Sequence, residues 1–566
     1  MAQEQARELP QPYTRQDLEA LGPTIQKLMD IAGTGGLVVG VQRDGDDPWY
    51  WCSDIDPSQP GKHQQRCREY TMFPIFSLTK LFTSMCVARW LAKVSDHTDI
   101  TWDTCVEDVE PKVNFRGGSL RRQVKIIDLL SHNTGMTKSG CYRGGSTGML
   151  IDEKDYVAFI NDQAAYRPAN TEFYYNNLGY KHAGHILDQN NQGRKSHCLS
   201  GWSDILKRGY LLPWRMYDTS TEYPGSDGAY ALEENHDIAD GYHMLETGEP
   251  VKLEAPSADG GTGFAHASGG MYSCAEDLLG AYMKVKRAIQ GRDDAPVEIR
   301  DPDKKLFTPQ TPIEAGYGDY CLGLVKVEFP GRMGYIGLSK DLMTDKQMPV
   351  IGNSKHPLSV YYHQGSGTRG LAGMAIVPDL DTVVVVLSNT LALNDCADWV
   401  LQLVMSTMLG GPASQDFIKH ATITKENNIR KHRMVRNTLN NGSKKPSSFN
   451  DLASCRGIYT SAGGYLDIEV EAEHGKLYWT KHRKRSWDTP APDRVERFQL
   501  YHYEGDTFHW LGPRREMAAR GIWVPKEEHY WVVTFHVEDG NVKGLTWLHD
   551  PHNPRSGKFK RVFERA

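Results

Sequence analysis

The sequence lacks several features that would assign it to a specialised class of protein. Its N-terminus has no apolar core of the kind that secretory signals carry, and no later stretch of about eighteen apolar residues predicts a membrane span. The ten cysteines are scattered, with no C-x-x-C pair among them. We therefore expect reduced thiols and a cytoplasmic location.

An excess of one charge and the common cofactor motifs are also missing. The formal net charge is −6, which gives no reason to expect a nucleic-acid or membrane partner. There is no H-E-x-x-H motif, histidine pairs such as His549 and His552 are isolated, and no P-loop or dinucleotide fingerprint opens a helix. We expect neither a metal nor a cofactor, and the oligomeric state stays open.

The chain is too long for one hydrophobic core, because 566 residues call for two or more domains. Runs of β-branched and aromatic residues predict strands near the N-terminus and again before residue 390, with helical apolar spacing between and after them. This order predicts an α+β domain whose sheet is assembled from both of its ends. The predicted strands are 36–43, 49–51, 322–329, 358–363, 373–377 and 382–387, and the predicted helices include 77–91, 124–130, 180–187, 271–289 and 395–408.

The last 150 residues change character twice. Residues 421–449 are polar, basic and poor in large apolar side chains, which predicts a solvated linker, with a basic docking surface as the alternative. Beyond them, short alternating aromatic runs separated by turn residues predict a small antiparallel barrel or sandwich. Its predicted strands are 464–470, 477–480, 498–503, 508–511 and 530–537.

One serine opens an apolar helix and is followed by a lysine three residues later. Ser77 and Lys80 fall in the first turn of this helix. Positions i and i+3 share a helix face, so the amine reaches the serine oxygen and can take its proton or stabilise the alkoxide. The partial positive charge of a helix N-terminus favours the same oxyanion. The alternative is a capping serine followed by an exposed lysine.

Two later segments carry groups that would complete such a site. Tyr175 leads into a helix with Asn177 two residues on, and a tyrosine can transfer protons if nearby cations lower its pKa. His363 and Gly365 end a predicted strand, where a glycine lets a carbonyl approach the backbone and the next N–H can form half of an oxyanion hole. Taken singly, Tyr175 is also explained as a core aromatic and His363 as a satisfied strand histidine.

The order S-x-x-K, Y-x-N, H-x-G resembles the class C β-lactamase, D-aminopeptidase and family VIII esterase group of serine hydrolases. Residues 126–136, 267–278 and 383–389 resemble further stretches typical of that group, so the likeness runs from about residue 34 to 409. The C-terminal segment resembles the lipocalin-like barrel appended to many such proteins.

The resemblance implies a fold, a division of the chain and a role for each site residue. It implies an antiparallel sheet flanked by helices with a helical subdomain over 1–420, the linker over 421–449, and a small antiparallel β-barrel over 450–566. Ser77 would be the acylated nucleophile, Lys80 its activating partner, Tyr175 the general base and later acid, and Asn177 a substrate ligand. His363 would take the basic position of the third motif, and the N–H groups of Ser77 and Ser366, next to Gly365, would form the oxyanion hole.

Several positions depart from the pattern or leave alternatives. Tyr174 also fits the Y-x-N register, although residues 178–180 favour Tyr175. His363 stands where β-lactamases and D,D-peptidases usually have a carboxylate-binding lysine, and it offers at most a switchable charge near pH 6–7. Arg369 is either the replacement cation for a substrate carboxylate or an ordinary surface residue.

Two further segments need a structural interpretation. Residues 331–356 look like an insertion before the H-x-G strand, and would form a lid, a substrate wall or a surface loop. Residues 144–148 fit the G-x-S-x-G elbow of α/β-hydrolases, but no apolar strand precedes them, so a flexible loop is the better interpretation.

We therefore expect a metal-independent serine hydrolase that acts through a Ser77 acyl-enzyme on an ester, amide or lactam of a small molecule or peptide. Acyl transfer to an acceptor other than water is a close variant, because only the second nucleophile differs. Two other classes stay open. One is an enzyme of specialised metabolism that uses Tyr175 for acid–base chemistry without acylation, and the other is a non-catalytic binding protein of the same fold.

Overall fold

The computed structural model describes most of the chain, and every structural feature below belongs to this part. The described residues are 13–53, 67–95, 97–115, 120–137, 151, 153–163, 165–189, 201–221, 223–224, 237–254, 263–299, 305–353, 357–410, 416–442, 445–449, 451–483, 496–522, 527–549 and 558–562. The G-x-S-x-G segment at 144–148 lies outside them.

Strands from both ends of the first domain form one antiparallel sheet, as predicted. β1 (Leu37–Arg43) pairs along its whole length with β12 (Thr382–Ser388), so that Leu37 lies opposite Ser388. The sheet order is β2-β1-β12-β11-β10-β9-β8-β7. The other strands are β2 (Trp49–Cys52), β7 (Thr311–Pro312), β8 (Asp319–Tyr320), β9 (Val325–Phe329), β10 (Leu358–Gly367) and β11 (Gly370–Val377).

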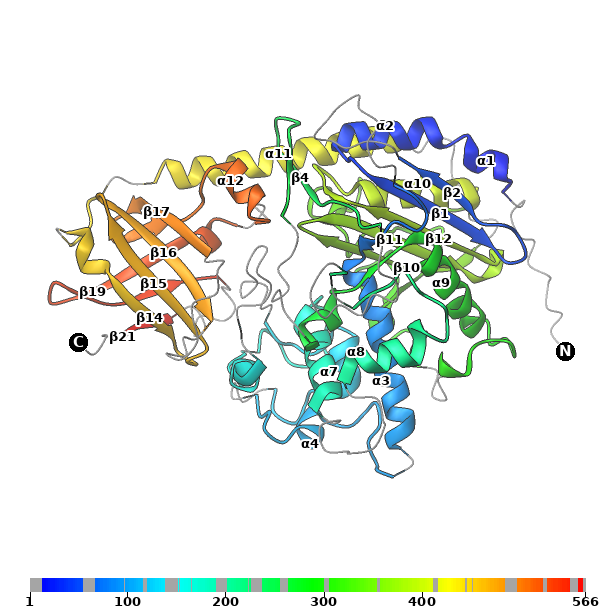
Figure 1. Ribbon diagram of the computed structural model, residues 1–566, viewed down its shortest axis with the longest axis horizontal. Coiled ribbons are helices and arrows are strands. Elements are labelled where there is room, and N and C mark those ends of the chain that lie inside the picture. Colours follow the sequence, from blue (N-terminus) through cyan, green and yellow to red (C-terminus); the bar gives the residue numbers. More distant parts are fainter. Residues whose placement is uncertain are drawn as a thin grey trace.

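Both faces of this sheet are apolar, because successive side chains of a strand point to opposite faces. On β12, Val384 and Val386 join one core together with the buried residues of α2 and α10, whereas Val383 and Val385 join another together with those of α3 and α9. Figure 1 shows these helices covering the sheet. Their bounds are α2 (Gly22–Ala32), α3 (Thr79–Val94), α9 (Ala275–Ile289) and α10 (Cys396–Met408), and a short α1 (Arg15–Glu19) precedes α2.

A helical subdomain packs beside α3, below the sheet in Figure 1. The inward face of α7, including Tyr180, Ala183 and Ile186, is buried in the same core as α3. The helices are α4 (Val106–Val109), α5 (Ile126–Leu130), α6 (Tyr156–Asn161), α7 (Asn177–Gln189) and α8 (Gly201–Leu206), with a π-helical turn at Lys207–Leu211. Two small sheets, β13-β4-β5 and β3-β6, are separate from the main sheet. Their strands are β3 (Phe73–Pro74), β4 (Tyr242–Met244), β5 (Pro250–Lys252), β6 (Tyr272–Ser273) and β13 (Thr390–Leu391).

Most of the segment that we interpreted as a solvated linker is a helix. α11 (Phe417–Asn440) has 24 residues and carries a sparse buried stripe that includes Ala421, Thr424, Val435 and Leu439. It packs on α2 at one end and reaches the C-terminal barrel at the other (Figure 1). The polar composition of this segment therefore reflects a helix with one narrow buried face.

The C-terminal strands close into an antiparallel barrel, as predicted. The order runs from β14 to β21, and β14 pairs with β21 to complete the ring. Buried aromatic rings, among them Trp479, Trp510, Trp531 and Trp547, fill the interior. The strands are β14 (Gly457–Ser461), β15 (Leu466–Glu473), β16 (Lys476–Arg483), β17 (Glu496–Glu504), β18 (Thr507–His509), β19 (Val532–Glu538), β20 (Asn541–Trp547) and β21 (Lys558–Val562).

The barrel is fastened to the first domain through its helix α12 (Arg514–Ala519). The Glu246 carboxylate, in the turn between β4 and β5, accepts hydrogen bonds from Arg514 Nε at 2.9 Å and contacts His432 Nδ1 of α11 at 2.7 Å. Arg514 also contacts His243 Nε2 of β4 at 2.9 Å. Because Leu245 and Val251 of the hairpin pack on Ala518 of α12, the junction has an apolar centre beside its charges.

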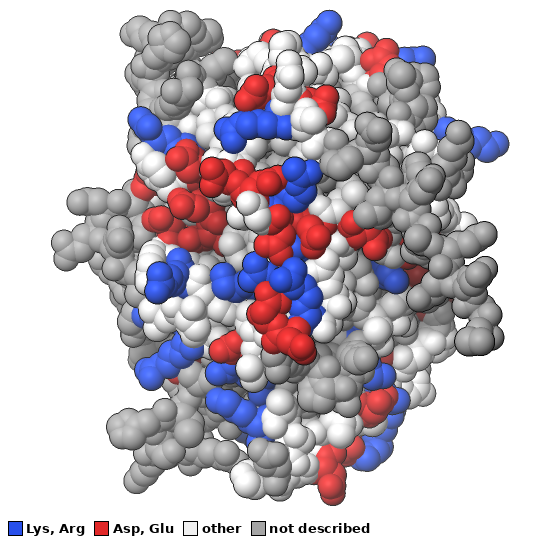
Figure 2. Space-filling view, turned by 90° about the vertical axis from the view of Figure 1, so that its right-hand side faces the viewer, with Lys and Arg blue, Asp and Glu red and all other residues white. Residues whose placement is uncertain are grey.

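Three further observations complete the description. Acidic and basic side chains lie intermixed over the face shown in Figure 2. Among the described residues, no helix combines the length and apolar character needed to cross a membrane. The cysteines Cys86, Cys105, Cys274, Cys321 and Cys396 are free thiols, whereas Cys141 and Cys198 lie outside the described residues.

Candidate active site

Ser77 lies in a tight turn that runs directly into helix α3. The residues Phe76–Leu78 form a single 3₁₀ turn, and α3 begins at the next residue. Phe76 has φ of 47°, a left-handed conformation that costs energy for a residue with a large side chain. The turn thus presents Ser77 at the helix N-terminus, one turn before Lys80, and the Ser77 side chain keeps partial exposure.

Lys80 is fully buried and hydrogen-bonded, so the alternative of an exposed lysine is wrong. Its Nζ donates to Ser77 Oγ at 3.0 Å, to Asn177 Oδ1 at 2.7 Å and to the Ser268 carbonyl at 2.7 Å. A buried charge is tolerated only when it has such partners. The Ser268 carbonyl was not predicted, because a backbone acceptor carries no signal in residue type.

Tyr175 completes the group from the start of α7. Its hydroxyl donates to Ser77 Oγ at 2.8 Å, and its ring centre lies 5.0 Å from Lys80 Nζ. Burial raises the pKa of the Tyr175 hydroxyl above its ordinary value, although the hydrogen bond with Ser77 acts in the opposite direction. This shift is opposite to the lowering by nearby cations under which a tyrosine transfers protons readily. The phenol is therefore protonated in the resting site.

The structure also places the neighbours of Tyr175. The Tyr174 ring stacks 4.7 Å from Tyr166 and 5.1 Å from the Arg167 guanidinium, away from Ser77. The Asn176 amide donates to the carbonyls of Met136 and Thr137. Of the two possible Y-x-N registers, the one that contains Tyr175 and Asn177 is thus the one that reaches Ser77 and Lys80.

The third motif lies on β10, which continues through it to Gly367 rather than ending there. A Cβ on Gly365 would come within 2.7 Å of the Ile75 carbonyl, so only glycine lets this strand lie against the Ser77 turn. Ser366 follows, opposite Leu371 of β11. The sequence prediction of a close backbone approach at Gly365 therefore has a physical basis in the packing of β10 on this turn.

His363 is buried and neutral, which corrects the expectation of a switchable charge near pH 6–7. Burial, and secondarily the charge on Lys80, lowers the pKa of His363 to about 3. Its Nδ1 lies 2.6 Å from the Gln364 carbonyl, so Nδ1 carries the proton and Nε2 accepts from the Tyr320 hydroxyl at 3.2 Å. Tyr320, which the sequence did not single out, thus holds His363 in one tautomer.

Arg369 follows β10 in the turn to β11 and lies at the foot of the β4–β5 hairpin. Its guanidinium donates to the Glu254 carbonyl and its side chain packs against Gly241. It is partly exposed. This contact uses only one of the five donors of the guanidinium, so it is compatible with both interpretations of Arg369.

The insertion at 331–356 forms a packed wall rather than a free loop in its described part, which ends at 353. The Tyr335 ring lies 5.1 Å from that of Tyr317 and meets the Phe173 ring edge-on at 6.0 Å, and the Phe173 ring lies 6.5 Å from that of Tyr175. The Leu338 N–H donates to the Asp395 carboxylate at 2.8 Å. The insertion therefore backs the aromatic side of the site.

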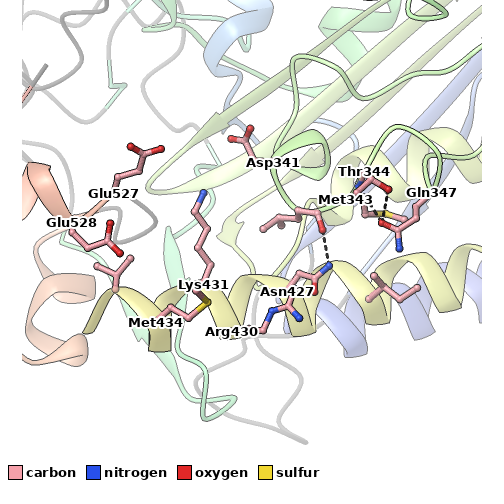
Figure 3. A pocket seen from close by; sticks show the side chains of 13 residues that line it. Asp341, Met343, Thr344, Gln347, Asn427, Arg430, Lys431, Met434, Glu527 and Glu528 are labelled. Carbon is pink, nitrogen blue, oxygen red and sulfur yellow. Dashed lines mark hydrogen bonds between the residues drawn. The ribbon is translucent and has the colours of Figure 1, made fainter. Parts of the chain in front are cut away.

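Residues of the insertion, of α11 and of the segment just before β19 line an open cavity of about 780 Å³. Figure 3 shows Lys431 rising from α11 toward Asp341 on one side and Glu527 and Glu528 on the other. The cavity is separate from Ser77. Within the described residues, no group of His, Cys, Asp or Glu side chains is arranged to hold a metal ion.

Comparison with known proteins gives a family and a fold. The β-lactamase family model matches residues 22–404. The chain is similar to an octameric penicillin-binding protein homologue from Pyrococcus abyssi, with 17% identity, a TM-score of 0.51, and coverage of 97% of this chain and 99% of that one. It is also similar to a class C β-lactamase, with 18% identity, a TM-score of 0.50, and coverage of 71% and 97%.

At these identities the structural likeness establishes the fold alone, and no curated protein matches the chain. The family match covers well over half of the 566 residues and spans all three motifs that surround Ser77. The chain belongs to the β-lactamase family.

Proposed function

We propose that this protein is a serine hydrolase that forms an acyl-enzyme at Ser77 with an ester, amide or lactam. The observation that carries the proposal is the position of Ser77 Oγ, which accepts hydrogen bonds from both Lys80 Nζ and Tyr175 OH. A serine oxygen between two such groups can lose its proton and be stabilised as it attacks a carbonyl. Family membership supports the same class of reaction.

The proton of Ser77 would pass into a shared network rather than to one fixed base. In the resting site both Lys80 and Tyr175 act as donors, so the reactive form has one proton fewer on this pair. On attack, Oγ bonds to the carbonyl carbon and its proton moves to the pair. The pair then returns the proton to the leaving group as the tetrahedral intermediate collapses to the acyl-enzyme.

The N–H groups of Ser77 and Ser366 are the proposed oxyanion hole. Support comes from the packing of β10 against the Ser77 turn, which Gly365 permits. Two backbone donors held by a strand and a helix start are preorganised for the charge that develops on the carbonyl oxygen. Asn177, which binds Lys80 and is exposed, is the proposed contact for a substrate amide.

The charge of the substrate is the second part of the proposal. Because His363 stays neutral, the third motif supplies no cation, and esters or amides without a carboxylate at this position fit best. Arg369 is the proposed exception. If it binds a carboxylate bidentately, Arg369→Ala should raise KM for acidic substrates and leave KM for neutral esters nearly unchanged. An equal effect on both substrate types would make it a surface residue.

The deciding experiment is intact-mass measurement after exposure to a fluorophosphonate and to a panel of activated esters and lactams. We expect one adduct per chain, located on Ser77 and absent in Ser77→Ala. Ser146→Ala, which alters the serine of the G-x-S-x-G segment, is the matched control and should still be labelled. Adding alcohol or amine acceptors to the acyl-enzyme then separates hydrolysis from acyl transfer. Turnover of a confirmed substrate by Ser77→Ala would remove the covalent mechanism.

A further inference from the structure

His132 occupies an unusual position at the end of helix α5. It is 1% exposed and has φ of 58°, although residues other than glycine seldom adopt a left-handed conformation. Histidine is among the few side chains enriched in that region, but its burial there still needs compensating contacts. Several of its contacts are with Tyr175 or with the backbone on either side of it.

His132 accepts two hydrogen bonds, from residues on either side of Tyr175 in the sequence. The His132 carbonyl accepts from the Tyr174 N–H at 2.9 Å, and His132 Nδ1 accepts from the Asn176 N–H at 3.0 Å. The backbone on each side of Tyr175 is thus fixed to a single residue. Because Nδ1 is an acceptor, the ring proton of neutral His132 lies on Nε2.

The imidazole ring also packs directly on the tyrosine ring. The centres of the His132 and Tyr175 rings lie 4.2 Å apart at 38°. The same imidazole lies 4.6 Å from Tyr320, 5.3 Å from Tyr180 and 5.6 Å from Phe173. His132 is therefore central to the aromatic cluster against which the Tyr175 ring is held.

We propose that His132 is a positioning residue that keeps the Tyr175 hydroxyl at hydrogen-bond distance from Ser77 Oγ. The inference rests on the proposed acyl-enzyme function. These contacts reach Tyr175 and not Ser77, so the effect passes through the backbone at residues 174 and 176 and through the tyrosine ring. Misplacing a catalytic group by about 1 Å can cost on the order of 10²-fold in rate, so these contacts set the rate of acylation.

Three variants separate the contacts. His132→Phe keeps a ring but has no acceptor for the Asn176 N–H. His132→Leu removes both the ring and the acceptor, and because its side chain is smaller it serves as the second variant if His132→Phe does not fold. His132→Asn keeps an acceptor and tolerates the left-handed φ. With an activated ester that labels Ser77, we expect kcat to fall roughly 10- to 100-fold in the first two. KM should stay within about twofold, and His132→Asn should recover part of kcat.

A double-mutant cycle distinguishes positioning from general damage to the fold. In a Tyr175→Phe background, His132→Phe and His132→Leu should cause almost no further loss, because the hydroxyl that they misplace is already absent. His509→Phe replaces another buried histidine, in the barrel, and should leave kcat unchanged. Additive losses in the cycle, or full activity in both His132 variants, would overturn the inference. Turnover by Ser77→Ala would instead overturn the function on which it rests.

Discussion

The Lys80 ammonium group is matched to its surroundings, because it has three N–H donors and three oxygen acceptors within 3.0 Å. One acceptor is the nucleophile, one is the Asn177 side chain and one is a backbone carbonyl. Loss of any of them would leave a buried N–H without that partner, at a cost of about 1–3 kcal/mol. The charge on Lys80 is therefore sensitive to small displacements of each of these three neighbours.

The first prediction concerns the proton network. Lys80→Ala and Tyr175→Phe should each lower kcat/KM by on the order of 10² or more, and the double variant should lose far less than the product of the two, because the groups serve one proton transfer. Tyr174→Phe is the matched control, since its ring points to Tyr166 and Arg167, and its activity should be unchanged. If Tyr174→Phe were inactive and Tyr175→Phe active, the Y-x-N motif would begin at Tyr174.

The second prediction concerns pH. An unperturbed histidine titrates near pH 6.5, but the pKa of His363 is lowered to about 3, so His363 gains no charge between pH 5 and 8. Any acidic limb of kcat/KM in that range should therefore lie at the same pH in the wild type and in His363→Gln. The Lys80–Tyr175 pair must lose a proton to act, so the rate should rise with pH. A limb near pH 6–7 that disappears in His363→Gln would contradict this assignment.

The order of the S-x-x-K, Y-x-N and H-x-G motifs, and their resemblance to a known family, brought Ser77, Lys80, Tyr175 and Asn177 to attention, whereas each spacing taken singly had an ordinary structural explanation. The neutral state of His363 could not be predicted from the sequence, since it depends on complete burial and on the charge of Lys80 from a distant helix. His132 lies in the stretch 126–136 that resembles the family, but nothing in the sequence assigned it a role. Its role depends on hydrogen bonds with the backbone about forty residues further on, which the pattern of that stretch does not record.

At the scale of elements, the Ser77 turn and β10 are held together by a contact that leaves no space for a side chain. Gly365→Ala should displace one element from the other, because its Cβ would meet a backbone carbonyl at 2.7 Å. We expect a loss of acylation rate of at least tenfold in a protein that still folds.

Gly280→Ala on α9 is the matched control for this third prediction. A Cβ there meets nothing within 4 Å, and alanine is favoured over glycine in a helix, so stability should rise slightly and activity should not change. The rate of Ser77 labelling and the midpoint of unfolding, measured for both variants, separate an effect on acylation from an effect on stability. Equal activity in Gly365→Ala and the wild type would mean that the approach of β10 is not required.

Elements with long apolar runs were predictable, and those with sparse patterns were not. The valine-rich β12 and the helix α10 were found within one or two residues of their ends. α11 was interpreted as a linker because its buried stripe includes Thr424 and His432, which do not read as core residues. Short paired strands such as β7 and β8 were missed because two residues cannot display a period.

At the scale of the whole molecule, the junction around Glu246 and Arg514 joins the barrel to the first domain. Both side chains are mostly buried, so Arg514→Met should destabilise the protein by on the order of 2–3 kcal/mol, because it leaves the carboxylate with fewer partners. Adding Glu246→Gln to the Arg514→Met variant should recover part of the lost stability. Thermal unfolding of the full chain measures the stability of the single and the double variant.

The neighbouring ion pair provides the control for this fourth prediction. Arg515 and Glu249 also connect α12 to the hairpin, but their side chains are 65% and 50% exposed. Arg515→Met should therefore cost less than about 1 kcal/mol. Equal shifts for the two arginines would show that the junction is held by its apolar contacts and not by the buried charges.

The pairing of β1 with β12 has a consequence for how the chain is made. Leu37 lies opposite Ser388, so the first long strand leaves the ribosome some 350 residues before its partner. At about 5–20 residues per second, this delay is roughly 20–70 s. During that time the valine-rich edge of β1 has no native neighbour, and an unpaired apolar strand is prone to aggregate. Production of this protein should therefore depend on chaperones and on synthesis rate more than on the stability of the finished fold.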